Sequence, residues 1–112
     1  MYRATTPVHS FVFSTDPAQF EKILITYAHA KDNKIILEKT EDDLTFSQET
    51  TDTGETKYVA SLQLTQEDTN LFNTFYGEMF FVQIRVKKSD GTVLASDKKT
   101  IYVKDVLNDE VL

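Results

Sequence analysis

Residues 79–103 of the chain read MFFVQIRVKKSDGTVLASDKKTIYV, a stretch that indicates two neighbouring strands and the turn between them. Residues 79–88 are apolar on both faces around Phe-Phe-Val, which is typical of a strand in the middle of a sheet. The Asp90-Gly91 pair that follows favours a tight hairpin turn. Residues 93–103 then return as a second strand, which we expect to bulge at its Asp-Lys-Lys sequence.

Shorter strand-like runs lie on the N-terminal side of this hairpin. They alternate apolar and polar residues or are rich in β-branched and aromatic residues, as strands are. These runs are VHSFVFS (8–14), KILITYA (22–28), KIILEKT (34–40), DDLTFS (42–47) and YVASLQL (58–64). The intervening QETTDTGETK, residues 48–57, has no apolar residue, and we expect it to form an exposed hairpin loop.

Two short helical turns are expected between the strands. Asp16 precedes Pro17, a pair that favours one capped turn before the next strand resumes. Thr65 is followed three residues later by Asp68, which predicts a second capped turn. The apolar residues expected to pack inward from this second turn are Leu71, Phe72 and Phe75.

The pattern as a whole predicts an all-β fold, an immunoglobulin-like antiparallel β-sandwich of about seven strands with one or two short helical turns. A small barrel would use the same strands and is the alternative architecture. A chain of 112 residues without a Gly- or Pro-rich linker is expected to form a single domain, residues 1–112. Within this domain, residues 105–112 are a candidate extended docking segment at the C-terminal end.

The composition disfavours several kinds of function. The chain has no cysteine, which removes disulfides, thiolate metal sites and cysteine nucleophiles. Its 18 acidic and 12 basic residues give a net charge of −6, and the basic residues are scattered, so we expect no nucleic acid and no membrane as a partner. No phosphate-cradling glycine loop is present, and we expect no cofactor. Without a long apolar run or a signal-like start, the sequence is interpreted as that of a protein made in the cytoplasm.

The sharpest enzymatic motif is Asp52-Thr53-Gly54, because Asp-Thr-Gly is the aspartic-protease signature. That chemistry needs the carboxylate buried beside its twin, so that the pKa values of the two groups separate. Here the flanking residues are polar, and an exposed turn in which Gly54 supplies a positive φ is the preferred interpretation. We expect no catalytic residue, and an aspartic-protease-like enzyme is the third and least favoured function.

His9 and His29 are the two imidazoles, and each lies on an expected strand. Neither has another histidine or a carboxylate at ligand spacing, so both are interpreted as structural or surface histidines. The acidic clusters at 41–43 and 67–68 lack the alternating ligands and the turn glycine of a calcium loop. We therefore expect no metal site.

Aromatic residues are the basis of the second functional hypothesis, a carbohydrate-binding β-sandwich module. Tyr76 and Tyr102 are the candidates for a platform on which a sugar would stack. Aromatic residues in alternating strands more often pack in the core or across strands, and the chain has no tryptophan. This hypothesis therefore ranks below assembly through protein contacts.

The last residues, KDVLNDEVL, mix apolar and acidic side chains up to the end of the sequence. Two interpretations stay open: the segment finishes packing the last strand and then frays, or it docks on a neighbouring subunit by adding to an exposed sheet edge. In the second case its acidic residues keep it soluble until it docks. The residues predicted to make contact are Val106, Leu107, Val111, Leu112, Lys98 and Lys99, with the two lysines on a strand edge.

Several stretches carry a resemblance to a known group of proteins. They are RATTPVHSFVF, ITYAHAKDNKIILEKTEDD, LQLTQEDT and the run from VQIRVKK to VLNDEVL. Together they cover nearly the whole chain and resemble small proteins encoded in phages and prophages of Gram-positive gut bacteria. These proteins look like immunoglobulin-like structural components of the tail or baseplate region, without established catalytic residues.

The resemblance implies a non-enzymatic phage or prophage structural or accessory protein that acts by assembly. Its partners would be proteins, either further copies of this chain or other phage structural proteins. The protein would be made in the bacterial host cytoplasm, and a place in the virion is compatible with the resemblance. An assembly role favours the docking interpretation of the last residues.

Overall fold

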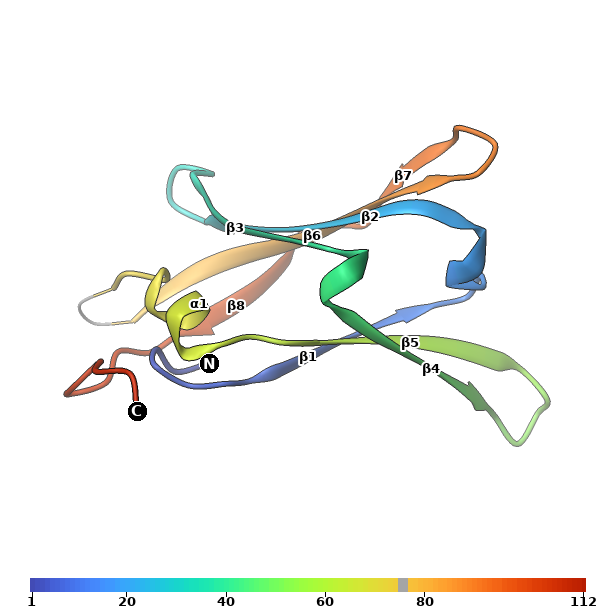
Figure 1. Cartoon of the computed structure of the whole chain (residues 1–112). Coiled ribbons are helices and arrows are strands. Elements are labelled where there is room, and N and C mark those ends of the chain that lie inside the picture. Colours follow the sequence, from blue (N-terminus) through green and yellow to red (C-terminus); the bar gives the residue numbers. More distant parts are fainter. Residues whose placement is uncertain (75–76) are drawn as a thin grey trace.

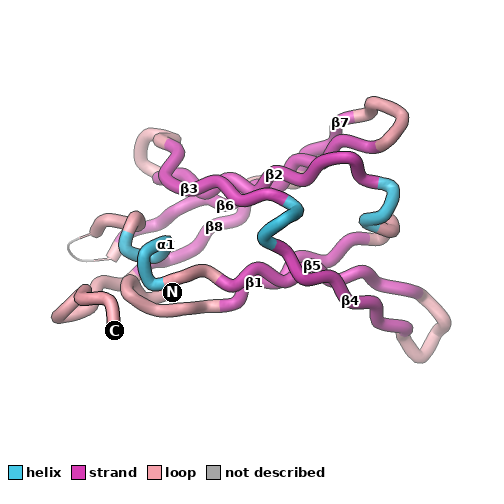
Figure 2. Tube along the Cα trace, viewed as in Figure 1, coloured by secondary structure: helices cyan, strands magenta, loops and turns pink. Residues whose placement is uncertain are grey.

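The computed structural model describes residues 1–74 and 77–112, and it is an all-β sandwich of two antiparallel sheets (Figures 1 and 2). One sheet has the strand order β1-β5-β4, and the other has the order β3-β2-β6, with β7 and β8 both paired to the remaining side of β6. The strands are β1 (Val8–Phe13), β2 (Phe20–His29), β3 (Ile35–Thr40), β4 (Leu44–Thr50), β5 (Thr56–Gln63), β6 (Glu78–Lys88), β7 (Val93–Ala95) and β8 (Lys99–Val103). The predicted antiparallel sandwich is therefore confirmed.

The strand order is that of an immunoglobulin-like domain. The first sheet holds the positions of strands B, E and D, and the second holds those of C′, C, F and G, with β7 and β8 together in the place of G. Strand A would lie beside β1, but the N-terminal residues run elsewhere: Tyr2 forms a parallel bridge to Lys104 beyond the end of β8. Within the described residues, the outer edge of β1 has no strand beside it.

β6 is the central strand, as its apolar residues on both faces predicted. It pairs with β2 on one side and with β7 and β8 on the other. The hairpin at Asp90-Gly91 is confirmed, since Gly91 has a φ of +90° and its N–H donates to the Lys88 carbonyl at 2.9 Å. The expected bulge in the return strand is a full break between β7 and β8. There Ser96 donates its N–H to the carbonyl of Ile84 and accepts the N–H of Ile84 on its hydroxyl.

Short helical segments connect the strands. They are η1 (Pro17–Gln19), η2 (Glu41–Asp43) and α1 (Gln66–Asn70). Asp16 caps η1 by accepting the N–H of Ala18 at 2.9 Å, so the first predicted turn is confirmed. Thr65 and Asp68 cap α1 reciprocally, each side chain accepting the other's backbone N–H at 3.0 Å. η2 carries the chain from β3 in one sheet to β4 in the other and so closes one side of the sandwich (Figure 1).

The tightest part of the core lies at the end of the sandwich that holds α1 and both termini (Figure 1). Tyr27, Phe72 and Phe80 are fully buried there. Phe72 packs edge-on against the other two rings, at centroid distances of 5.5 and 5.0 Å. β2 supplies Ile23, Ile25 and Tyr27 to one face, as its alternation predicted. Both sheets and α1 therefore share one hydrophobic core.

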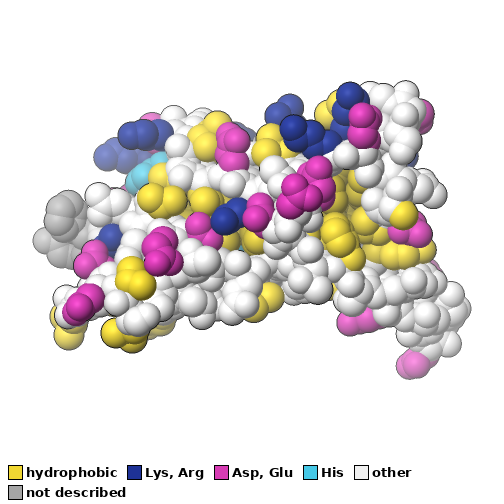
Figure 3. Space-filling model, in the orientation of Figure 1, with side chains coloured by type: hydrophobic (Ala, Val, Ile, Leu, Met, Phe, Trp, Pro, Cys, Tyr) yellow, Lys and Arg dark blue, Asp and Glu magenta, His cyan; other side chains and the backbone are white. Residues whose placement is uncertain are grey.

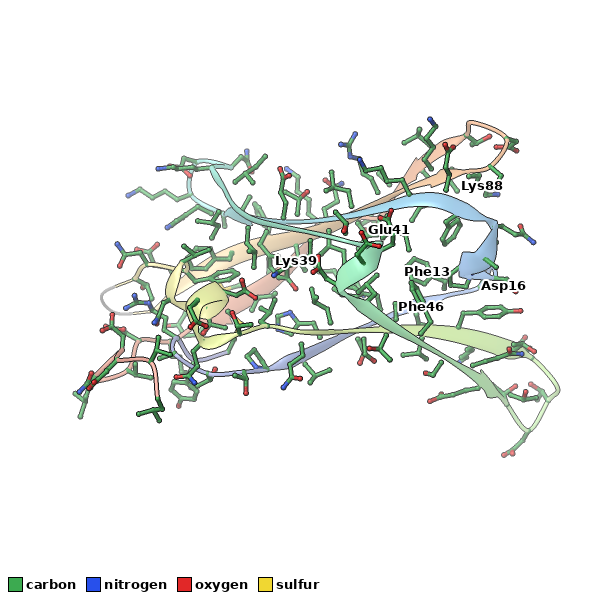
Figure 4. The ribbon with its side chains drawn as sticks, viewed as in Figure 1. Phe13, Asp16, Lys39, Glu41, Phe46 and Lys88 are labelled. Atoms are coloured by element: carbon green, nitrogen blue, oxygen red, sulfur yellow. The ribbon has the colours of Figure 1, made fainter. Side chains whose placement is uncertain are left out.

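The sheets are less well closed at the opposite end. Phe46 on β4 pairs with the inward-facing Ala60, yet its side chain is 44% exposed. Apolar side chains show between the two layers at this end in the space-filling view (Figure 3). Phe13 and Phe46 both point into this space, beside the capping residue Asp16 (Figure 4).

Two expectations about individual segments are wrong. The polar run 48–57 is only partly loop, because β4 and β5 continue as a paired ladder to Thr50 and Thr56. Backbone hydrogen bonds hold this ladder without any apolar side chain. Leu71 does not pack inward: it is the C-cap residue of α1 and its side chain is 49% exposed, whereas Phe72 is buried as expected. Phe75 lies outside the described residues.

Candidate functional site: a groove between the two sheets

A groove of about 670 Å³ opens between the outer edge of β1 and the strands of the opposite sheet. It lies where strand A would stand in a complete sandwich, on the side opposite η2. One wall is formed by residues 8–15. The other is formed by alternate residues of β6 together with residues 94–96 and 99–101. The groove is therefore an unfilled strand position in the sandwich.

The β1 wall is half-exposed although it belongs to the core face. Phe11 and Phe13 point inward, because they pair with Ala60 and Tyr58 on the inner face of β5. Ala60 is fully buried, whereas no residue of β1 is buried. Phe13 also packs edge-on against Phe20 at a centroid distance of 5.5 Å. The phenylalanine rings stay at the groove surface because no described strand covers them.

The opposite wall is formed by the inner faces of β6 and β7. Val82, Ile84 and Val86 are the most exposed members of the buried core cluster, at 7 to 9%. Leu94 pairs with Val86 and so faces the groove, yet it is 47% exposed. Its neighbour Val93 faces the outside and is 56% exposed. These two neighbours thus have similar exposure on opposite faces of one strand.

The two lysines predicted at the edge point in different directions. Among the described residues, Lys99 is the one Lys, Arg, Asp or Glu that lines the groove. It pairs with the inward-facing Val82, so it projects inward from β8. Lys98 lies on the outer face, with its Nζ 5.3 Å from the centre of the Phe81 ring. An inward lysine on an edge strand also hinders indiscriminate strand addition.

His9 joins the groove to the core. Its Nδ1 lies 2.6 Å from the Tyr27 hydroxyl, a hydrogen bond from one sheet to the other. Burial, and to a smaller degree the charged N-terminus, lowers the pKa of His9 below its ordinary value, while burial raises the pKa of Tyr27. His29 lies 2.6 Å from the carboxylate of Glu78 on the neighbouring strand. Both histidines are used in structural contacts.

The Asp52-Thr53-Gly54 motif lies at the tip of the β4–β5 hairpin, where all three residues are exposed. Gly54 has a φ of +85°, and its N–H donates to the Thr51 carbonyl at 2.9 Å. This is the exposed turn that the flanking residues predicted. The position does not supply the burial that aspartic-protease chemistry requires of its carboxylate.

The other candidates give no site in residues 1–74 and 77–112. No group of three His, Asp or Glu side chains gathers there to hold a metal ion. Tyr102 lies over Gly77, where an added Cβ would collide with its ring. Tyr76, its companion in the predicted sugar platform, lies outside the described residues. No helix in those ranges is long and apolar enough to span a bilayer.

Residues 105–112 form no strand within their own chain and lie against α1, where Asn70 and Gln66 bond to the backbone of Asp109 and Leu112. Docking of the segment in an extended form stays a prediction. Arg3, whose side chain is 11% exposed, binds Asp105 at 2.9 Å and Asp109 at 3.2 Å. Of the apolar residues predicted to make contact, Val106 is half-buried, Val111 is half-exposed, and Leu107 and Leu112 are fully exposed. The segment is thus held by polar contacts, those of its two aspartates with Arg3 and those of its backbone with α1, and its two leucines face solvent.

The lining of the groove is the part of the site that the sequence analysis missed. Phe11 and Phe13 were assigned to the inner face of a strand, and that pattern is the same whether the face is covered or open. One signal in the sequence could have found it: residues 1–7, MYRATTP, show no strand alternation and so indicate no strand that would cover the edge of β1.

Comparisons with known proteins give little guidance. The chain matches no protein-family model and no curated protein. Among the solved structures that match is the crystal structure of AggA, the major subunit of aggregative adherence fimbriae type I from Escherichia coli, with 12% sequence identity over 92% of this chain and 84% of that chain. The TM-score of the match is 0.31, which is too low to support an argument about fold or function.

Proposed function

We propose that this chain is a non-enzymatic structural or accessory protein that acts by binding other proteins, as a component of a phage or prophage tail or baseplate. The observation that carries the proposal is the open groove beside the edge of β1, with which no strand of the described residues pairs on its outer side. A free strand edge binds an extended peptide by adding it to the sheet, with backbone hydrogen bonds supplying affinity. The apolar groove alongside would receive alternate side chains of such a peptide.

The groove suits a peptide better than a sugar or a reacting substrate. Its walls are mostly aliphatic and aromatic. The polar groups that reach it are Lys99, several hydroxyls and His9, and the Nδ1 of His9 is already bonded to Tyr27. A sugar site or an active site needs several polar groups aimed at one point. A strand-shaped partner needs only backbone hydrogen bonds and apolar side chains, which this groove can match.

The phage part of the proposal rests on the sequence resemblance. The resembling stretches cover nearly the whole chain, including residues 3–13, which contain β1, and the run that ends at residue 112. The proteins that they resemble look like tail or baseplate components, for which binding to other subunits is the main task. The protein would then be made in the host cytoplasm and carried in the assembled particle.

The test is incorporation into particles in a host strain that carries the gene. Leu94→Lys places a charge in the groove, and Val93→Lys places the same charge on the outer face of the same strand. Prophage particles are induced, purified on a density gradient and analysed for the chain by quantitative mass spectrometry. We expect equal amounts of the wild-type and Val93→Lys chains, and about tenfold or more less of Leu94→Lys, because docking would bury its charge without a partner.

Each outcome bears on a different part of the proposal. Absence of the wild-type chain from purified particles would overturn the assignment to the phage. Equal incorporation of Leu94→Lys would overturn the assignment of the groove as the contact surface. Circular dichroism and thermal melting of the purified variants show that each is folded, as expected for substitutions at positions about half exposed.

A further inference from the structure

We infer that the groove binds residues 106–112 of a second copy of this chain. The inference rests on the proposed function, because it names the partner of the same groove. The chain carries both halves of such a contact. It has an apolar groove that no described strand fills, and it has an apolar and acidic segment whose leucines nothing covers. Docking one into the other removes the groove and the apolar side chains on one face of the segment from water.

The docking segment makes little use of its apolar residues in its own chain. Leu107 and Leu112 are fully exposed. The contacts that hold the segment are polar, and they include hydrogen bonds between the Gln66 side chain and the backbone of Leu112 at 2.7 and 3.3 Å. These bonds lie at the surface, where water replaces them easily. Release of the segment therefore exposes no further leucine.

The length and the alternation of the segment match the groove. Residues 8–14 of the edge wall span roughly 20 Å at about 3.3 Å per residue, and an extended segment from 106 to 112 spans the same length, roughly 20 Å. Alternate residues of an extended segment share a face, so Leu107, Asp109 and Val111 point the same way. That face presents an apolar, an acidic and an apolar side chain in order.

The groove offers the complementary order. Along the wall formed by β8 and β7, Lys99 lies between Ile101 and Leu94. Ile101 and Lys99 pair with Phe80 and Val82, two positions apart on β6, whereas Leu94 pairs with Val86, four positions beyond Val82. With Asp109 facing Lys99, one of its apolar neighbours Leu107 and Val111 therefore lies beside Ile101, and the other lies level with Ile84, which also lines the groove. No carboxylate of the described residues lines the groove, so a neutral or basic segment would leave this lysine without a partner. The charge of the groove thus selects an acidic occupant.

The cost of the exchange within the donor chain is small. Asp109 gives up its ion pair with Arg3, which lies at a position where the Asp109 side chain is 57% exposed. Arg3 keeps its closer partner Asp105, at 2.9 Å, because that residue precedes the part of the segment that enters the groove. The buried guanidinium therefore stays paired.

The segment is better placed for a neighbour's groove than for its own. It begins after Lys104, whose N–H donates to the Met1 carbonyl and whose own carbonyl accepts the N–H of Arg3, at 2.8 and 3.0 Å. These N-terminal residues stand beside the end of β8. Residues 105–112 leave β8 at the end of the sandwich away from β7 (Figure 1). A second copy receives the segment without any change in this arrangement.

Each copy then offers one segment and one groove. Such a contact either closes reciprocally between two copies or continues head to tail into a ring or a filament. Self-association follows in each case, and it is the property that the experiment measures.

The test is complementation between two full-length variants. Leu107→Ser alters the segment at a residue that is fully exposed in the isolated chain, and Leu94→Lys blocks the groove. On size-exclusion chromatography with light scattering, we expect the wild type to associate and each variant alone to be monomeric. Mixed together, the variants should form a complex of one copy of each. The Leu94→Lys chain still has a segment, and the Leu107→Ser chain still has a groove.

Two controls make the same substitutions elsewhere. Val93→Lys lies outside the groove on the same strand as Leu94, and Leu71→Ser removes another exposed leucine outside the segment. Both are expected to associate like the wild type. Loss of association in these controls would show that any added charge or lost surface leucine prevents association, wherever it lies. That result would overturn the assignment of groove and segment.

A charge exchange tests the register of the docked segment. Lys99→Glu is expected to weaken association about tenfold or more, and Asp109→Lys in the same chain is expected to restore it. A purely structural role of either residue would not give this rescue. Failure of the second substitution to restore association would overturn the pairing of Asp109 with Lys99.

The outcomes separate this inference from the proposed function. A wild-type chain that is monomeric at every concentration, or a mixture of variants that does not associate, would overturn self-docking. If that chain is still present in phage particles, the proposed function stands and the groove takes a segment of another protein. If complementation succeeds but the particles lack the chain, self-docking stands and the proposed function fails.

Discussion

At the scale of single residues, the bond between His9 and Tyr27 ties the open edge strand to the core. His9 lies on β1 and Tyr27 on β2, and the imidazole Nδ1 is 2.6 Å from the hydroxyl. A neutral imidazole accepts the hydroxyl proton at Nδ1, whereas a protonated one cannot. Burial is the main reason that the pKa of His9 lies below 6.5 in the folded chain, and the charged N-terminus adds to it.

The stability of the chain should therefore depend on pH below 6.5. Between 6.5 and the lower pKa of folded His9, the unfolded chain binds a proton at this residue and the folded chain does not. The free energy of unfolding is thus expected to fall as the pH decreases through this window, and to receive a constant contribution above it. His9→Gln keeps an acceptor for the Tyr27 hydroxyl but does not titrate, so it should lose most of this dependence.

Urea unfolding at one pH above the window and one within it makes the comparison. Both chains carry Leu107→Ser, so that self-association does not contribute to the measured stability. The same pH dependence with and without His9 would mean that another group titrates in this range.

At the scale of elements, α1 shows how the chain holds a helix of five residues. A helix this short is not stable by itself, so its caps and its tertiary contacts maintain it. The Asp68 carboxylate accepts the Thr65 N–H and also binds Nζ of Lys39 on β3 at 3.1 Å; Lys39 is labelled in Figure 4. Burial alone would raise the pKa of Asp68, but the bonds from Thr65 and Lys39 outweigh it, and the pKa is lowered.

Removal of the cap should destabilise the whole sandwich, because α1 packs Phe72 into the core. We expect Thr65→Ala to lower the free energy of unfolding by about 1 kcal/mol, the usual effect of deleting an N-cap hydroxyl. Ser47→Ala, on the exposed part of β4, is the control and should change it little. Urea unfolding gives both values. Equal values for the two variants would mean that α1 forms without its cap.

The sequence predicts the elements that depend on neighbouring residues, and it does not predict those that depend on contacts between strands. β6 is predicted because its apolar run is typical of a central strand, and it is paired on both sides, although only its inner face is buried. The caps at Asp16 and Thr65 are predicted because they depend on residues within the same turn. The extension of β4 and β5 into polar sequence is not predicted, since a backbone ladder needs no particular side chain there. The break between β7 and β8 depends on Ser96 bonding to Ile84, a contact across strands.

At the scale of the whole molecule, the fold class follows from the alternation, but the groove does not. The groove is a relation between two edges, β1 in one sheet and the β7–β8 pair in the other. Phe11 has the same sequence pattern whether a further strand covers it or not. Likewise, the ion pairs of Arg3 with Asp105 and Asp109 could not be predicted from the sequence, because the partners lie about a hundred positions away along the chain.

The sandwich is consequently closed at one end and open at the other. Phe80 of β6 is fully buried beneath Phe72, whereas Val86 of the same strand borders the groove. The second half of β6 is covered on its outer edge only by the three residues of β7, all of them exposed. One half of β6 therefore lies in the closed core, and the other half lies along the open groove.

Hydrogen exchange along β6 should reveal this gradient. Local opening exposes amides in proportion to how few buried contacts hold them, so the amides of Phe80 and Val82 should exchange about tenfold or more slowly than those of Val86 and Lys88. Exchange measured by NMR in the Leu107→Ser chain reports the undocked sandwich. In the wild type, docking of a second copy would cover the groove and raise protection near Val86 selectively. Uniform protection along β6 in the undocked chain would instead mean that the sandwich opens as a single unit, and that the unfilled strand position carries no local weakness.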